Sequence, residues 1–349
     1  MDNYKIKRIF KNDISENKKI ENLLLDENII KDKNLDYTIG LYDSDENLIA
    51  TGSSYKNTLR CFAVNKSYQG EGILNKIVTH LINYQYEIGN FHLFLYTKPQ
   101  SAKFFENIGF FPIVNINNEI VFMENEKLGF ENYLNDLKKE SKNLESKNIT
   151  AIVMNANPFT LGHLFLIETA SKENDLVHLF ILSEDSSLIP FSIRYKLILE
   201  GTKHLKNIIY HLSGDYIIST ATFPSYFLKD ENLVMENHAK IDIEIFKKIA
   251  AKLNIKKRYV GEEPFSKVTN IYNQVMEEEF SKTNIKFIQI PRKKIAGNII
   301  SASKVRELIH NNQLEKIKDF VPPSTYLFFN SKEAEKIINN IKNSNDYLH

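Results

Sequence analysis

The second half of the chain alternates short apolar runs with segments of helical periodicity. Between the runs, apolar residues recur three or four positions apart, as at Leu164, Ile167 and Ala170, which is typical of amphipathic helices. Continuous apolar strands separated by helices indicate a parallel sheet covered on both faces. In such sheets, ligands bind beyond the carboxyl ends of the strands. The candidate strands are 149–154, 177–182, 207–210, 258–261 and 285–290.

The first half predicts a different kind of sheet. Residues 37–42, 48–52 and 59–64 read as three strands of a meander, with a polar turn at 43–47. A glycine loop at 68–72 follows the third strand, and the apolar residues after it have helical spacing. A strand at 91–97 and a segment at 102–110 come next. The pattern indicates an α+β domain in front of an α/β domain.

A polar stretch at 125–148 separates these two patterns. It is rich in Lys, Glu and Asn, yet Phe130, Leu134 and Leu137 keep a helical spacing. At 349 residues the chain is also too long for one typical core. We therefore predict a domain over 1–127, a connecting helix over 128–148 and a second domain over 149–349.

Composition narrows the partners and the compartment. Hydrophobic residues make up 42%, charged residues 26%, and the net charge of +1 gives no reason to expect nucleic acid or a membrane as partner. The N-terminus is charged, and nowhere do about 18 apolar residues run together. The single cysteine, Cys61, rules out an internal disulfide and reads as a small buried hydrophobe. We expect a cytoplasmic protein.

Candidate chemistry begins at 155–163, where the first apolar run of the second half passes into a helix. Gly162 and His163 fall at the opening of this helix. Backbone N–H groups and the positive end of the helix dipole attract anions there, and an imidazole can donate to a phosphoryl oxygen. A capped helix with an incidental histidine would show the same short pattern.

A second candidate lies near the end of the chain, at 300–306. Ser301 and Ser303 can cap a helix and turn hydroxyls toward phosphate, and Arg306 supplies a forked cation one turn later. A plain capped surface helix is the alternative reading. The pair of motifs, TxGH after a first strand and SxSxxR on a late helix, resembles the cytidylyltransferase-like nucleotidyltransferase superfamily.

The first half resembles the GNAT fold over roughly 30–124, through the loop at 69–72 and the segment ending at Phe110. Leu74 stands at the last small position of the family's glycine pattern. Phe105 stands where a tyrosine commonly serves as general acid, and phenylalanine cannot donate a proton. Three readings stay open for this module: an acetyltransferase, a pantetheine-binding module and an inert remnant of the fold.

Almost the whole chain is similar to the citrate lyase ligase family, through 155–163, 214–229, 261–265, 272–274 and 300–306 together with the order of domains. The resemblance implies a GNAT-like α+β domain followed by a Rossmann-like nucleotidyltransferase α/β domain with a parallel sheet. It implies an AMP-forming ligase that uses ATP, with Mg²⁺, and acetate. The acceptor would be the thiol of the dephospho-CoA-derived prosthetic group on the acyl carrier subunit of citrate lyase.

Residue roles follow from the resemblance. His163 and Thr160 are the predicted catalytic residues, and no dedicated metal ligands are expected, because Mg²⁺ binds mainly through phosphate and water. Weaker candidates for leaving-group contacts are Arg194, Lys293 and Lys294, for each of which solvated surface charge is the simpler reading. The predicted ATP-binding residues are Asn157, Phe159, Gly162, Glu262, Ser301, Ser303 and Arg306, and those predicted for the pantetheine arm are Gln69, Gly70 and Gly72.

Two alternatives remain at this point. One is a nucleotidyltransferase that joins a nucleotide to a phosphorylated small molecule, such as pantetheine phosphate or nicotinamide mononucleotide. The other is a non-catalytic nucleotide-binding scaffold.

Overall fold

A computed structural model divides the chain into two compact units, 1–132 with 222–244, and 133–221 with 245–349. Two of the three divisions fall within helices α4 (Gly129–Glu140) and α7 (Glu231–Leu253), and the third, between 221 and 222, lies outside the described residues. The predicted boundaries at 127 and 149 stay a prediction, and 142–147 of the predicted connecting helix lie outside the described residues. The structure describes residues 4–70, 72–116, 119–141, 148–184, 187–217, 223, 231–262, 267–295, 298–344 and 347.

The first unit is built on a seven-stranded mixed sheet of order β1-β2-β3-β4-β5-β7-β6. Neighbouring strands are antiparallel except β4 and β5, which run parallel and pair only where Thr58 and Leu59 meet Phe94 and Leu95. The predicted meander and the strand after it are confirmed as β2 to β5, whereas β1, β6 and β7 were not predicted. The strands are β1 (Lys5–Ile9), β2 (Tyr37–Tyr42), β3 (Leu48–Tyr55), β4 (Thr58–Val64), β5 (Phe94–Thr97), β6 (Phe111–Ile116) and β7 (Ile120–Glu124).

Two apolar clusters cover the two faces of this sheet. The first contains Val64 at the end of β4 and the buried side of α2, while the second contains the preceding residue, Ala63, with Cys61 and the buried side of α1. Strand side chains alternate between faces, so the two helices lie on opposite faces. Cys61 is buried as predicted, and burial raises the pKa of its thiol to about 12. The helices are α1 (Ile14–Asp26), η1 (Lys66–Tyr68), α2 (Ile73–Glu87) and α3 (Pro99–Asn107).

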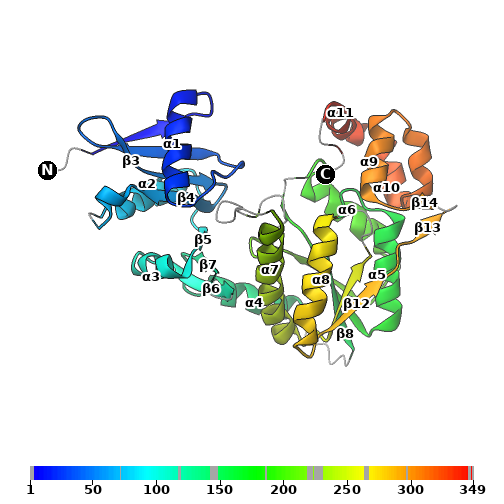
Figure 1. Ribbon diagram of the computed structural model, residues 1–349. Helices are drawn as coiled ribbons and strands as arrows, with labels where there is room; N and C mark the ends of the chain where they lie inside the picture. The colour runs from blue at the N-terminus through cyan, green and yellow to red at the C-terminus, as the bar shows by residue number, and fades with distance from the viewer. Residues whose placement is uncertain are drawn as a thin grey trace. The chain divides into compact units, whose positions relative to one another are not determined.

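The second unit contains a five-stranded, fully parallel sheet of order β10-β9-β8-β11-β12 (Figure 1). All five predicted strands are confirmed, as is the predicted parallel sheet. Strand order reverses between β8 and β11, and ligands bind at such switch points beyond the carboxyl ends of the strands. The strands are β8 (Ile149–Met154), β9 (Leu176–Ile181), β10 (Ile208–Leu212), β11 (Lys257–Gly261) and β12 (Lys286–Ile290), with a separate hairpin of β13 (Lys294–Ile295) and β14 (Asn298–Ile299).

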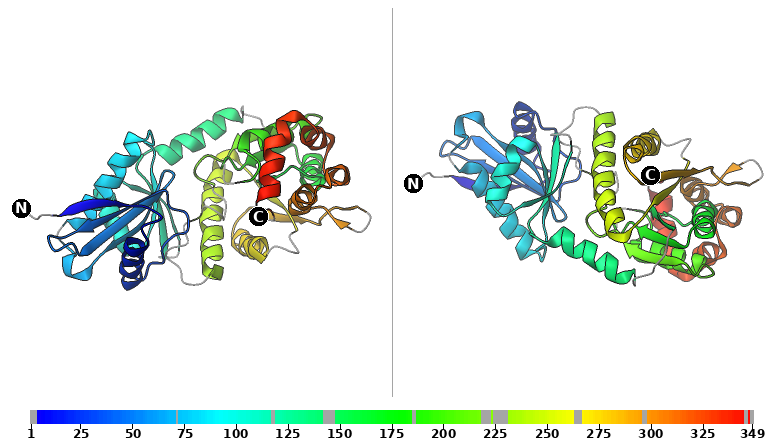
Figure 2. Two further views of the ribbon diagram at one scale, coloured as in Figure 1. Left: turned by 90° about the horizontal axis from the view of Figure 1, so that it is seen from above. Right: turned by 90° about the horizontal axis from the view of Figure 1, so that it is seen from below.

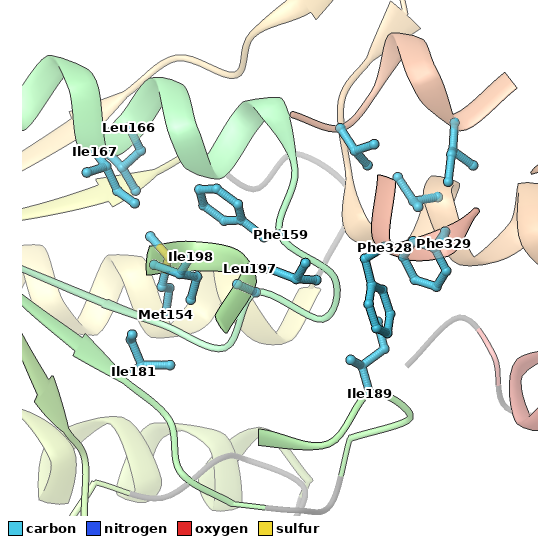
Figure 3. Close-up of a cluster of buried hydrophobic side chains, with 14 of the residues drawn as sticks. Met154, Phe159, Leu166, Ile167, Ile181, Ile189, Leu197, Ile198, Phe328 and Phe329 are labelled. Atoms are coloured by element: carbon cyan, nitrogen blue, oxygen red, sulfur yellow. The ribbon is translucent and has the colours of Figure 1, made fainter. Parts of the chain in front are cut away.

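The helices of the second unit enclose its core. Helix α5 contacts β9 and β11 and packs against α6, which contacts α10 in turn. Helix α9 contacts α11, the red helix of Figure 2. Figure 3 shows Phe159 pointing into the apolar cluster that Leu166, Ile167 and Leu197 also line. The helices are α5 (Leu161–Glu173), α6 (Phe191–Thr202), α8 (Lys267–Ser281), α9 (Ala302–His310), η2 (Leu314–Asp319), α10 (Pro323–Phe329), η3 (Lys332–Ala334) and α11 (Glu335–Asn343).

Within the described part of the chain, no helix is both long enough and apolar enough to cross a bilayer.

Candidate functional site

Helix α5 follows β8 after the loop at 155–160, and its first turn is fixed by a reciprocal cap between Thr160 and His163. The Thr160 hydroxyl oxygen accepts from the His163 N–H at 3.3 Å, and the Thr160 N–H donates to Nδ1 of the His163 ring at 3.1 Å. A backbone N–H can only donate, so Nδ1 must be an acceptor. The proton of the neutral imidazole therefore sits on Nε2.

His163 is neutral at physiological pH. Burial lowers the pKa of its ring to about 4, and the nearby positive charges of Arg292 and Arg306 act in the same direction. A neutral ring with its proton on Nε2 is a hydrogen-bond donor that adds no charge. The cap thus orients a donor and selects its tautomer.

The first turn of α5 leaves one amide for a ligand. The Leu161 N–H donates to the Phe320 carbonyl at 2.9 Å, and the His163 N–H is taken by Thr160. Among the described residues, no acceptor is found for the Gly162 N–H. Amides of this kind at a helix N-terminus bind anions.

Helix α9 opens in a similar way. The Ser301 hydroxyl caps it by accepting from the Lys304 N–H at 3.1 Å, and it lies 3.1 Å from the Ser303 hydroxyl. The Ala302 and Ser303 amides have no acceptor within the described part of the chain. Two hydroxyls and two amides are therefore grouped at this helix start.

The structure brings the starts of α5 and α9 together. A Cβ built on Gly162 would lie 3.4 Å from the Ile300 carbonyl oxygen, just before the α9 cap. Two motifs about 140 residues apart in the sequence thus adjoin at the carboxyl edge of the sheet. Two positive helix ends in one region favour an anion with several negative oxygens.

Arg306 does not lie on the surface of this region. Its side chain is 5% exposed, and its guanidinium donates to the Asn157 carbonyl and, at 2.6 Å, to the Tyr347 carbonyl. These bonds fasten α9 to the loop after β8 and to the C-terminal segment. The predicted contact between Arg306 and phosphate stays a prediction.

Asn157 and Phe159 serve the loop itself. Asn157 Oδ1 accepts from the Ile189 N–H at 3.2 Å, and the fully buried Phe159 ring lies nearly parallel to His163, with centroids 6.1 Å apart. A Cβ on Gly201 would approach the Phe159 ring to 2.5 Å, so α6 packs directly against it. The Phe159 side chain supports the His163 ring from the core and does not present a surface to a ligand.

Arg292, which the sequence reasoning missed, lies beside this site. Its Nε donates to the Glu262 carbonyl and its Nη1 to the Ile300 carbonyl, each at 2.8 Å. Glu262 follows the end of β11, and its exposed side chain receives the Arg292 N–H at 3.5 Å. Nothing in the local sequence pattern distinguishes Arg292 from Lys293 and Lys294. No signal in the sequence could therefore have directed the choice to Arg292 instead of the two lysines.

Arg194 is not the solvated surface charge that was the simpler reading from the sequence. It is completely buried and donates to the backbone carbonyls of Ile189, Asn155, Leu182 and Glu184. It therefore holds the loops after β8 and β9 together, and its predicted contact with a leaving group stays a prediction.

Lys293 and Lys294 are the other two weak candidates for leaving-group contacts. The Lys293 ammonium lies over the Phe165 ring at 5.6 Å from its centroid. The Lys294 side chain is outside the described residues, as are 263–265 of the stretch at 261–265 and most of 218–229.

The glycine loop of the first unit has a different character. Gly70 and Gly72 have φ of 91° and 73°, and a Cβ on either would meet nothing within 4 Å. The Gln69 side chain donates to the Val64 carbonyl at 3.2 Å, which ties the loop to the end of β4. The loop presents open backbone at the start of α2. Phe105 is buried in the adjoining core, and phenylalanine has no acidic proton to donate.

Comparison with known proteins completes this description. Residues 149–329 match the family described as the citrate lyase ligase C-terminal domain. The [citrate [pro-3S]-lyase] ligase of Haemophilus influenzae is 37% identical over 308 residues, covering 86% of this chain and 91% of that protein. The Escherichia coli K12 enzyme of the same name is 38% identical over 334 residues, covering 91% and 94%.

Solved structures align with parts of the chain. A putative nicotinate-nucleotide adenylyltransferase from Vibrio parahaemolyticus covers 57% of this chain and 97% of its own, at 18% identity and a TM-score of 0.35. Escherichia coli ElaA covers 36% and 100%, at 14% identity and a TM-score of 0.31.

The sheet topologies define the class, an α+β unit with a mixed sheet followed by a Rossmann-like α/β unit with a parallel sheet, which confirms the predicted fold class. The identity to the two ligases over most of the chain is decisive for the family. The chain belongs to the citrate lyase ligase family and is an enzyme of the ligase class.

Proposed function

We propose that the chain uses ATP and acetate to acetylate the thiol of the prosthetic group on the acyl carrier subunit of citrate lyase, forming AMP. An acetate oxygen attacks the α-phosphorus of ATP and pyrophosphate leaves, which gives acetyl-adenylate. The thiol then attacks the acetyl carbonyl, loses its proton, and AMP leaves. The observation that carries the proposal is the meeting of the α5 and α9 starts around a neutral His163.

The residues divide into two groups in this proposal. His163 donates from Nε2 to an α-phosphoryl oxygen, where charge grows in the transition state, and Thr160 holds the ring in that tautomer. The Gly162 amide supports the same phosphate. Ser301 and Ser303, with the first amides of α9, receive the β- and γ-phosphates.

Arg306 acts more remotely in this arrangement, by keeping α9 against the loop after β8. Glu262 lies at the end of β11, on the edge where nucleotides bind in sheets of this kind. We expect Mg²⁺ to arrive with ATP. It would be held by phosphate oxygens and water, since this ion retains several waters in nucleotide sites.

The first unit has its own part in the proposal. The arm derived from dephospho-CoA carries a pyrophosphate, and the loop at Gly70 and Gly72 leaves open backbone where such a group can approach. The buried Phe105 cannot act as a proton donor, which fits binding better than catalysis of acetyl transfer. The first unit would then hold the arm and the second would make the adenylate.

Acetate-dependent exchange of labelled pyrophosphate into ATP tests the first step. We expect exchange with the full chain only when acetate is present. Exchange that requires a phosphorylated alcohol in place of acetate would favour a nucleotidyltransferase. Nucleotide binding without any exchange would favour a scaffold. The acetyl mass added to the carrier protein measures the second step.

A further inference from the structure

We propose that Arg292 is a positioning residue of the nucleotide site, which couples the end of β11 to the start of α9 and keeps the α9 anion-binding turn beside α5. This inference rests on the proposed function for its kinetic readout. The Arg292 side chain donates to two backbone carbonyls, those of Glu262 and Ile300.

The positions of the two carbonyls explain how Arg292 can influence the nucleotide site. The Glu262 carbonyl follows the last residue of β11, at the switch point of the sheet. The Ile300 carbonyl lies 3.4 Å from the Cβ position of Gly162, and it immediately precedes the Ser301 cap. A shift of Ile300 therefore moves the α9 amides relative to the first turn of α5.

Arginine suits this task and lysine does not. A guanidinium is planar and donates in two fixed directions, so it can span two acceptors at set positions. A lysine ammonium keeps the charge but is a single point on a flexible stem. The two effects of Arg292, its geometry and its charge, can therefore be separated by substitution.

The charge of Arg292 also acts on His163. Burial is the largest cause of the low pKa of this ring, and the charged groups that add to it are Arg292 and Arg306. A neighbouring cation disfavours the imidazolium, so removing Arg292 raises the pKa of His163. A residue with a purely structural role elsewhere would leave this pKa unchanged.

The experiment compares Arg292→Met, Arg292→Lys and the control Lys286→Met, which removes a positive charge from the opposite end of β12. We expect Arg292→Met to lower kcat/KM for ATP in acetate-dependent exchange at least 10-fold and to shift the acidic limb of the pH profile upward. Arg292→Lys should keep the acidic limb near its wild-type position while kcat/KM stays at least 5-fold low. Lys286→Met should stay within 2-fold.

A second measurement separates this inference from the proposed function. Titration of the His163 ring by NMR in the full chain needs no reaction, and it should show a higher pKa in Arg292→Met than in the wild type or in Lys286→Met. Thermal melting identifies any variant that fails to fold, and Arg292→Lys then carries the test. Exchange and titration that match Lys286→Met would overturn the role of Arg292. A wild-type chain without exchange would instead count against the proposed function alone.

Discussion

Both units contain a strand, a loop and a helix start with a glycine at its N-cap or in its first turn, yet among the described residues only the start of α5 has further polar groups packed beside it. In the first unit, α2 begins at Gly72 with no side-chain cap, and its loop faces open space. In the second unit, α5 begins with a reciprocal cap, and α9 and Arg292 adjoin it. A similar local arrangement thus gives an open backbone surface in one case and a helix start flanked by a second helix start in the other.

The comparison teaches that the groups packed around a helix start determine how strongly it can bind an anion. An exposed helix start attracts anions weakly, because its field is screened by solvent and salt. A second helix start and a half-buried donor strengthen the interaction, since they work at lower local dielectric than exposed groups. We therefore expect changes at α5 to affect chemistry and changes at α2 to affect binding.

The largest effect should come from His163. We expect His163→Ala to lower acetate-dependent exchange by about 10²- to 10³-fold, the usual cost of removing one transition-state donor. Because the ring is neutral, His163→Gln, which retains an N–H donor, should recover part of the loss. Steady-state exchange rates, with melting curves as a check on folding, measure both. Near-normal exchange in the alanine variant would remove His163 from the mechanism.

A smaller effect is expected where α5 meets α9. Alanine at Gly162 places its Cβ 3.4 Å from the Ile300 carbonyl, so Gly162→Ala should be tolerated to within a few-fold. Gly162→Val adds branches that push the two helix starts apart, and a shift of about 1 Å can cost about 10²-fold in rate. Exchange kinetics on both variants provide the measurement. Equal rates for the two would mean that the spacing of the helix starts does not govern the reaction.

The two units could be predicted from the sequence to different degrees. Apolar runs and turn residues are local signals, and they located all five strands of the second unit and the starts of α5 and α9. The edge strands β1 and β6 were missed, because short strands with mixed burial, such as Lys5–Ile9, lack a clear alternation. Pairing of distant segments through side-chain bonds leaves no periodic trace.

Arginines illustrate that limit. Arg194 and Arg306 are buried against backbone carbonyls, and Arg292 spans two of them. Their acceptors come from other loops, so residue type alone assigns these cations to solvent or to phosphate. The two motifs that meet in the structure were recognisable in the sequence, and the arginines that hold the surrounding loops were not.

A buried pair of histidines predicts that acid destabilises the second unit. His178 Nδ1 lies 2.8 Å from His211 Nε2, and His211 Nδ1 lies 2.6 Å from a Glu140 oxygen. Burial lowers the pKa of His178 to about 3 and that of His211 to about 4. Each ring binds a proton more readily in the unfolded chain, so the free energy of unfolding is fully present above pH ~6.5. Between pH ~6.5 and pH ~4 it falls by about 1.4 kcal/mol per pH unit for each of the two histidines.

Urea unfolding between pH 7.5 and 5 measures this loss. Burial raises the pKa of Glu140, which opposes the trend only near the range where that carboxyl titrates. His211→Gln should flatten the pH dependence of the free energy of unfolding. The matched control is His204→Gln, since His204 is exposed and pairs with Glu168, and it should leave the slope unchanged. A flat wild-type curve over this range would contradict the prediction.

The smallest and most selective effect should come from Gly72. A valine there enters the open space before α2, where we propose that the pyrophosphate of the arm binds, and it also strains a backbone at φ 73°. We expect Gly72→Val to slow acetylation of the carrier thiol about 10-fold, equivalent to about 1.4 kcal/mol, while acetate-dependent exchange stays normal. Gly89→Val is the matched control, because Gly89 has a similar φ of 87° and equal open space. It follows the C-terminal end of α2, so it carries the strain without blocking the loop. Thiol acetylation slowed equally by both valines would mean that strain, and not the loop at Gly72, accounts for the loss.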